Sequence, residues 1–143
     1  NRLKAVEELV KAGIPVNVNL APVIYNLNSD EIFDIAREVG ERGAYSLSYI
    51  MVRLNGQIGE IFENWVKNAV PERAEKVLHH IRDTHNGTLN ESRFGSRMRG
   101  EGKYAEQVAA TFKLARKKFI KAPQPAEMDY SSFLVNPKQL SLF

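Results

Sequence analysis

Hydrophobic positions in the first third of the chain switch between the spacing of a helix and the spacing of a strand. Leucines and valines recur at helical spacing over residues 3–10, and apolar residues alternate with polar ones over 14–24. The same order is repeated, because an apolar helical face over 32–39 is followed by an alternating segment over 44–54. Helix, strand, helix and strand with short connections predict an α/β fold in which helices cover a parallel sheet.

Polar residues inside the two predicted strands suggest what the sheet faces. Asn17 and Asn19 share one face of the first strand, and Ser46 and Ser48 share one face of the second. A parallel strand that is covered on both faces is apolar on both. Two neighbouring strands that turn small polar groups to the same side are therefore expected to line a hydrated cavity, while their apolar faces pack under helices. The alternative is a pair of edge strands with one solvated face.

The second half of the chain is predicted to be mostly helical. An apolar stripe over 58–66 is expected to be core, and a further helix begins at Pro71. A loop rich in arginine and glycine occupies 88–102, and an amphipathic helix is predicted at 104–119. The remaining residues contain three prolines and few periodic positions, as is typical of an extended tail. The chain is accordingly divided into three segments: 1–57, 58–119 and 120–143.

Composition narrows the class of protein. The 143 residues are 43% hydrophobic and 26% charged, which suits one globular domain or part of a larger one. No apolar run approaches the roughly 20 residues that cross a bilayer, and no signal peptide opens the chain, so we expect a cytoplasmic protein. The absence of cysteine excludes a disulfide framework, a thiolate zinc site, a cysteine nucleophile and a cysteine-ligated iron–sulfur cluster within these residues. Because the chain begins at Asn1, already inside a predicted helix, we expect a fragment that lacks its N-terminal portion.

Charge is distributed unevenly along the sequence. The stretch from Arg93 to Lys121 contains nine basic and two acidic residues, a surplus of seven positive charges, although the whole chain carries only +3. The rest of the chain therefore has a net charge of −4. A basic C-terminal third on an acidic body predicts an anionic partner, and the alternative is a solvated helix face.

The loop before the last predicted helix is a candidate anion or nucleic-acid site. Arg93, Arg97, Arg99 and Lys103 lie there among three glycines. Glycines let an anion approach the backbone, arginine forks suit phosphate oxygens, and a helix start adds free N–H groups. The pattern matches neither a P-loop nor a dinucleotide fingerprint. It is compatible with a lid over a substrate or a contact with a nucleic-acid backbone, and the alternative is a loop whose arginines pair with acidic groups of its own protein.

The ends of the two predicted strands form a second candidate site. Ligands of parallel α/β sheets bind at the carboxyl edge, where both strand ends meet. The turn after the first strand contains Pro22, which fixes the backbone, and Asn26 and Asn28, whose side chains offer donors and acceptors. Arg53 follows the second strand and is suited to a carboxylate or phosphate. The alternatives are an ordinary β–α turn with an asparagine cap, and a surface ion pair for Arg53.

The three histidines do not predict a metal site. His79 and His80 are adjacent on a helix and face different directions, and His85 lies past the end of that helix. We interpret all three as surface residues or as partners of the helix dipole. The sequence contains no legible Ser-His-Asp set and no distinctive pair of carboxylates, so no metal ligand and no catalytic residue is assigned.

Four stretches of the sequence together resemble a known family. They are APVIYNLN at 21–28, YIMVRL at 49–54, PERAEKVL at 71–78 and SRFGSRMRGEG at 92–102. In this order they resemble the C-terminal half of radical S-adenosylmethionine proteins related to spore photoproduct lyase, which are often labelled DNA repair photolyase-like. The resemblance covers roughly residues 2–119, and the last of the four stretches is its most specific part.

The resemblance implies a fold and two cofactors. The fold would be the C-terminal part of a partial (β/α)6 TIM-type barrel whose last two strands are 14–24 and 44–54, followed by a helical extension and an extended tail. The intact protein would use S-adenosylmethionine and a [4Fe–4S] cluster held by a CxxxCxxC motif in its N-terminal half. The turn at 22–28 would approach the methionine or ribose part, and the backbone of 52–54 the adenine. The cofactor-binding residues implied are Asn17, Asn19, Pro22, Val23, Ile24, Asn26, Asn28, Ser48, Val52, Arg53 and Leu54.

The resemblance also implies an activity for the intact protein. It would be a lyase-like, repair-related enzyme that cleaves S-adenosylmethionine reductively and starts radical chemistry on DNA or a nucleotide. The fragment alone is expected to be inactive and to bind neither cofactor, because the cluster cysteines are missing. The resemblance does not settle the substrate, since a thymine-dimer-like lesion is suggested only by the lyase name.

The end of the chain carries a separate motif. Gln139, Leu140, Ser141, Leu142 and Phe143 resemble the pentapeptide by which bacterial DNA polymerases and repair proteins bind the sliding clamp. The apolar residues would enter a pocket on the clamp, with the glutamine as a polar anchor. The alternative is a tail that packs on its own domain or on a neighbouring molecule. These features support a second hypothesis, a non-catalytic module that binds nucleic acid and the clamp, and open sheet edges would let the fragment self-associate.

Overall fold

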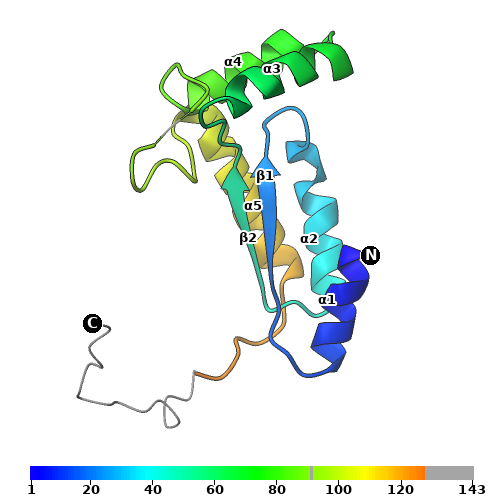
Figure 1. Cartoon of the computed structure of the whole chain (residues 1–143). Helices are drawn as coiled ribbons and strands as arrows, with labels where there is room; N and C mark the ends of the chain where they lie inside the picture. The colour runs from blue at the N-terminus through cyan, green and yellow to red at the C-terminus, as the bar shows by residue number, and fades with distance from the viewer. Residues whose placement is uncertain (91, 128–143) are drawn as a thin grey trace, which may run out of the picture.

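The computed structural model describes residues 1–90 and 92–127, which form a mixed α/β structure (Figure 1). The predicted order of helix, strand, helix and strand in the first 54 residues is confirmed, and each strand is shorter than its alternating segment. The elements are α1 (Arg2–Lys11), β1 (Asn17–Val23), the 3-10 helix η1 (Ser29–Glu31), α2 (Ile32–Glu41), β2 (Ser46–Met51), α3 (Ile58–Ala69), α4 (Ala74–Thr84) and α5 (Gly102–Phe119).

The two strands are parallel neighbours. Asn17 lies opposite Ser46 and Asn19 lies opposite Ser48, so the polar positions of the two strands are in register. Residues of α2 and α5 share one hydrophobic core with the sheet. The predicted α/β class is therefore confirmed. Within the described residues the sheet is open and has two strands, and its place in a barrel stays a prediction.

The main core lies between the sheet and helices α2 and α5. Leu47, Tyr49 and Met51 alternate along β2 and are all buried in it, as the period of a strand requires. Phe112 of α5 meets the ring of Tyr49 at 4.5 Å between centroids. Each side chain of this size contributes roughly 1.5–3 kcal/mol by leaving water. The apolar face of the strands thus packs under helices, as the sequence predicts.

Helices α2 and α5 approach closely enough that their crossing requires glycine. A Cβ atom at Gly40 would collide with the main-chain carbonyl of Phe119. The rings of Phe33 and Phe119 meet edge to face beside this crossing, at 6.2 Å between centroids. Helix α5, which is distant in sequence, is thereby fixed against the first two helix–strand units.

A second core lies between the ends of the strands and helices α3 and α4. Val66 and Leu78 are fully buried there. The expectation that the whole α3 stripe is core is wrong, because Ile58, Ile61 and Trp65 are 53%, 66% and 49% exposed. Helix α3 packs along only one flank, and among residues 1–90 and 92–127 no element covers these three side chains. The period of the sequence identified a helix but not which of its apolar positions are buried.

Candidate functional site

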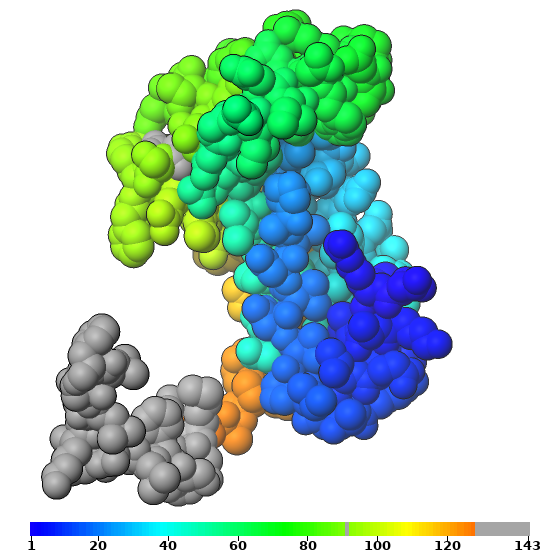
Figure 2. Space-filling model, viewed as in Figure 1, coloured from blue at the N-terminus to red at the C-terminus, as the bar shows by residue number. Residues whose placement is uncertain are grey.

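The polar face of the sheet is uncovered in the described part of the chain. Asn17 and Asn19 are exposed, and Ser46 and Ser48 are half-buried. The hydroxyl of Ser48 donates to Oδ1 of Asn19 at 3.3 Å, so the two strands are also joined through side chains. Figure 2 shows β1 at the molecular surface between α1 and the α3–α4 pair. The structure therefore brings the four predicted polar residues together on one face, where they are open to a ligand or to water.

The turn after β1 is closed by its own side chains. Oδ1 of Asn28 accepts from the amide of Ile24 at 2.8 Å, and its Nδ2 donates to the carbonyl of Pro22 at 3.1 Å. Asn26 has a φ of 61°, and its amide donates to the hydroxyl of Ser29 at 3.0 Å. Both polar atoms of the Asn28 side chain are thus engaged within the turn, as in an ordinary β–α turn. Contact of this turn with a cofactor stays a prediction.

The apolar site candidates are buried, so only their main chains could reach a ligand. Val23, Ile24, Val52 and Leu54 all contribute side chains to the two cores. The main chain of Val52 is already bonded on both sides. Its amide donates to the carbonyl of Val23 at 2.9 Å, and its carbonyl accepts from Nε2 of His85 at 2.8 Å. The end of β2 is therefore held in place by a strand and by a histidine.

The interpretation of the histidines as surface residues is wrong for two of the three. His80 is 4% and His85 is 1% exposed, whereas His79 is exposed. Since a carbonyl only accepts, Nε2 of His85 is the donor in this hydrogen bond. Positive φ angles of 56° at Asn86 and 85° at Gly87 turn the chain directly after this residue. No local signal reveals the role of His85, because Val52 lies 33 positions away.

His80 belongs to an aromatic cluster that holds the turn after β1 against the helices. Its ring lies 4.2 Å from that of Tyr104 and 4.9 Å from that of Tyr25, between centroids. The hydroxyl of Tyr25 also donates to Oε1 of Gln107 at 2.7 Å. Burial, and to a lesser degree the positive charges of neighbouring residues, lowers the pKa of His80 below its usual 6.5. A neutral His80 therefore acts as a packing group for the carboxyl edge of the sheet.

Arg53 is a predicted site residue whose side chain forms no hydrogen bond with a described residue. It follows β2 and is half-buried, and its Nε is buried without a hydrogen-bond partner in residues 1–90 and 92–127. No described acidic side chain forms an ion pair with it. A partly buried cation without a partner is costly, so this guanidinium is suited to an anionic ligand. The surface ion pair that was the alternative is not found among the described residues.

Each of the four cations of the arginine–glycine loop lies beside an acidic or an aromatic side chain. Arg93 forms an ion pair with Glu101 at 3.1 Å. The side-chain charges of Arg97, Arg99 and Lys103 lie over the rings of Phe94, Tyr49 and Tyr104, at 5.6, 4.4 and 4.7 Å from the centroids. The structure therefore brings Arg99 to the edge of β2, and it places Lys103 on the aromatic cluster. Binding of an anion by these four residues stays a prediction.

Phe94 at the tip of this loop is a candidate that the sequence analysis missed. It is 94% exposed, with the guanidinium of Arg97 beside it. The base of the loop is fixed, because the carbonyl of Met98 accepts from the amide of Met51 at 3.0 Å and the amide of Glu101 donates to Thr84 at 3.0 Å. An aromatic residue between arginines, SRFGSR, was the available signal. The loop thus presents one aromatic ring and nearby positive charge on an anchored base.

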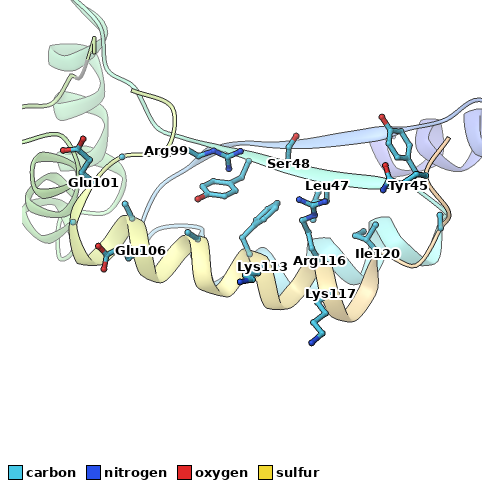
Figure 3. A pocket seen from close by; sticks show the side chains of 18 residues that line it. Tyr45, Leu47, Ser48, Arg99, Glu101, Glu106, Lys113, Arg116, Lys117 and Ile120 are labelled. Carbon is cyan, nitrogen blue, oxygen red and sulfur yellow. The ribbon is translucent and has the colours of Figure 1, made fainter. Parts of the chain in front are cut away.

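A groove of about 870 Å³ runs between β2 and α5 (Figure 3). Its floor is apolar and includes Leu47, Tyr49 and Phe112. Its rim carries Arg99, Lys113, Arg116 and Lys117, with Glu101 and Glu106 near the start of α5. The sequence predicted a basic helix here, but only the fold shows that part of its charge borders an apolar groove.

The remaining predictions concern the clamp motif, a metal site and a membrane-spanning helix. The proposed clamp-binding residues, 139–143, fall outside the described residues. In the described ranges, no three histidine, aspartate or glutamate groups lie together in a way that could hold a metal ion. No helix of the same ranges is long and apolar enough to cross a membrane.

Comparison with protein-family models, with curated proteins and with solved structures found no match for this chain.

Proposed function

We propose that this chain is the C-terminal part of a radical S-adenosylmethionine barrel, whose upstream half carries the cluster and completes the cavity. The observation that carries the proposal is the uncovered polar face of two parallel strands, followed by an Arg53 for which no described residue supplies an ion pair. A barrel that encloses a hydrophilic nucleotide needs small polar side chains on its inner face and apolar ones under its helices. Asn17, Asn19, Ser46 and Ser48 meet the first condition, and the buried side of β2 meets the second.

The residues of this chain fit one of the two implied groups. The sequence has no thiolate for a [4Fe–4S] cluster, so no step through the cluster is assigned to it. S-adenosylmethionine offers a carboxylate, ribose hydroxyls and an adenine, and when bound it supplies the group that starts radical chemistry on DNA or a nucleotide. Arg53 provides a charge for the carboxylate, while Asn17 and Ser48 provide neutral donors and acceptors. These residues bind and orient, and none is placed to move a proton.

The test uses the intact protein that contains this chain, reconstituted with iron and sulfide. The upstream sequence is expected to contain CxxxCxxC, and the protein is expected to release 5′-deoxyadenosine from S-adenosylmethionine under reducing conditions. Loss of one charge-assisted hydrogen bond costs roughly 1.5–3 kcal/mol, so Arg53→Gln should raise the KM for S-adenosylmethionine about tenfold or more. Arg37→Gln is the matched control, because Arg37 pairs with Asp34 on the surface of α2. An upstream half without that cysteine motif, or equal KM values for the two variants, would refute the proposal.

Phe94 favours a second candidate function, binding of single-stranded nucleic acid. A nearly fully exposed ring beside arginines can stack on an unpaired base while the arginines contact phosphates. Stacking is worth about 1–3 kcal/mol per base, so Phe94→Ala should weaken binding of a fluorescent oligothymidine roughly 5- to 150-fold. Ile61→Ala removes another exposed apolar side chain, on α3, and should change nothing.

Two further readouts separate electrostatic contacts and the clamp motif from stacking. Arg97→Ala and Arg99→Ala should each make the affinity less dependent on salt. Leu142→Ala with Phe143→Ala should abolish capture by the sliding clamp and leave oligothymidine binding unchanged. Equal oligothymidine affinities of the Phe94 and Ile61 variants would eliminate the stacking hypothesis, and unchanged capture would eliminate the clamp hypothesis.

A further inference from the structure

The outer edge of β2 has main-chain groups that no described residue pairs with. At the end of the strand, the amide of Val52 donates to β1, whereas the amide of Met51 donates to Met98 on the other side. Successive residues of a strand direct their main-chain groups to opposite edges. Leu47 and Tyr49 therefore turn their N–H and C=O groups to the same edge as Met51. In residues 1–90 and 92–127 only Met98 meets this edge through a main-chain hydrogen bond.

This edge borders the groove of about 870 Å³ above α5. Leu47 and Tyr49 both line the groove, so a strand added at this edge would lie over it. Alternate side chains of such a strand would point toward α5, where glutamates can lay their methylene groups over the apolar floor and extend their carboxylates to the helix. The groove thus offers main-chain partners along one wall and apolar contacts below.

The opposite wall is positively charged. Lys113, Arg116 and Lys117 lie along α5 at the groove, and none of them forms an ion pair with a described acidic residue. Arg99 adds a charge at the end where Met98 closes the edge. These charges complement carboxylates on the side of an added strand that faces α5.

We propose that this groove binds an extended acidic polypeptide segment, which adds to β2 as a third strand and pairs its carboxylates with the cations of α5. Addition of a strand uses main-chain hydrogen bonds for affinity and side-chain contacts for specificity. The rings of Tyr49 and Phe112 in the groove are buried and offer no face on which a base could stack, so these two rings do not favour single-stranded nucleic acid. This inference does not depend on the proposed radical chemistry, since it concerns the outer edge of β2 and not the polar face.

Nuclear magnetic resonance of the full ¹⁵N-labelled chain tests the proposal. The probe is the capped peptide Glu-Val-Glu-Val-Glu-Val-Glu at low salt. It should shift the amide signals of Leu47 and Tyr49 and slow their hydrogen exchange. The same peptide with N-methyl groups on every residue should not bind, because it lacks main-chain donors on both of its edges.

Two charge-matched variants locate the site on α5. Lys113→Glu with Arg116→Glu reverses two charges at the groove and should weaken binding at least roughly threefold. Lys118→Glu with Lys121→Glu reverses two charges on the same stretch of chain outside the groove lining and should have a smaller effect. Equal weakening by the two pairs would overturn the proposal, because charge alone and not the groove would then bind the peptide.

Other occupants give different results and would also overturn the proposal. A seven-nucleotide oligothymidine that shifts the Leu47 and Tyr49 amides more than the peptide would identify a nucleic-acid groove. Slow exchange of these amides in the full chain, which becomes fast in a chain ending at Glu127, would identify residues 128–143 as the occupant. Unchanged Leu47 and Tyr49 signals at millimolar peptide would show that the edge does not accept a strand.

Discussion

The hydrogen bond from His85 to Val52 makes a prediction about how the end of β2 is held. His85→Leu removes the only donor that residues 1–90 and 92–127 supply to the Val52 carbonyl, which is buried with its residue. A buried acceptor left without a partner costs about 1–3 kcal/mol. Part of this cost is offset, because leucine is apolar and also removes the buried Nδ1, which has no partner in the described residues. We therefore expect a net loss of about 1–2 kcal/mol in the free energy of unfolding.

His85→Gln is the matched control for this experiment. Glutamine is close in length to histidine and can place an amide nitrogen near the position of Nε2, so it keeps a donor for Val52. Its stability should lie between those of the wild-type chain and the leucine variant. The comparison isolates the hydrogen bond from the change in packing, because both variants replace the ring.

Urea unfolding followed by circular dichroism measures the difference. The midpoint should fall for His85→Leu while the dependence on urea stays unchanged, because the surface exposed on unfolding is nearly the same. For a chain of this size the loss corresponds to roughly 2–8 °C in Tm. Hydrogen exchange at the Val52 amide should also accelerate in the leucine variant, since its strand end is released. A leucine variant as stable as the wild type would refute the reasoning. So would a glutamine variant that is no more stable than the leucine variant.

Two further predictions concern the helix crossing and the dependence of stability on pH. Gly40→Ala should lower the free energy of unfolding by about 1–3 kcal/mol, because its Cβ meets the Phe119 carbonyl. Gly59→Ala, whose Cβ has ordinary contacts, should raise it by about 0.5–1 kcal/mol. Equal urea midpoints for the two variants would contradict this. Because the pKa of His80 is lowered in the folded state, the unfolded chain takes up the proton first as the pH falls through 6.5, and stability is lost in that range. His80→Phe should reduce the fall of the urea midpoint between pH 7.5 and 5, because it removes the group that takes up about one proton on unfolding. An unchanged dependence of the midpoint on pH would contradict this.

The sequence by itself determined the elements and the two faces of the sheet. Alternation of apolar and polar residues is a local property of the backbone, so the strands and their polar positions were predictable before any contact was known. The placement of Asn17 with Ser46 and of Asn19 with Ser48 followed once the strands paired in parallel. The helical spans were predictable for the same reason, but the predicted helix start at Pro71 is wrong, because residues 71–73 form a turn and α4 begins at Ala74.

Burial and pairing between distant segments were decided only by the tertiary structure. The helical stripe at 58–66 did not reveal that Ile61 is exposed, because periodicity does not say which neighbour covers a helix. The partner of His85 lies 33 positions away, and Gln107 lies 82 positions from Tyr25, so no local pattern joins them. The groove likewise exists because α5 returns to the open edge of β2. The sequence of each segment determines its hydrophobic period, whereas the tertiary fold determines which segments are in contact. The burial of His85, the exposure of Phe94 and the charged groove all depend on those contacts.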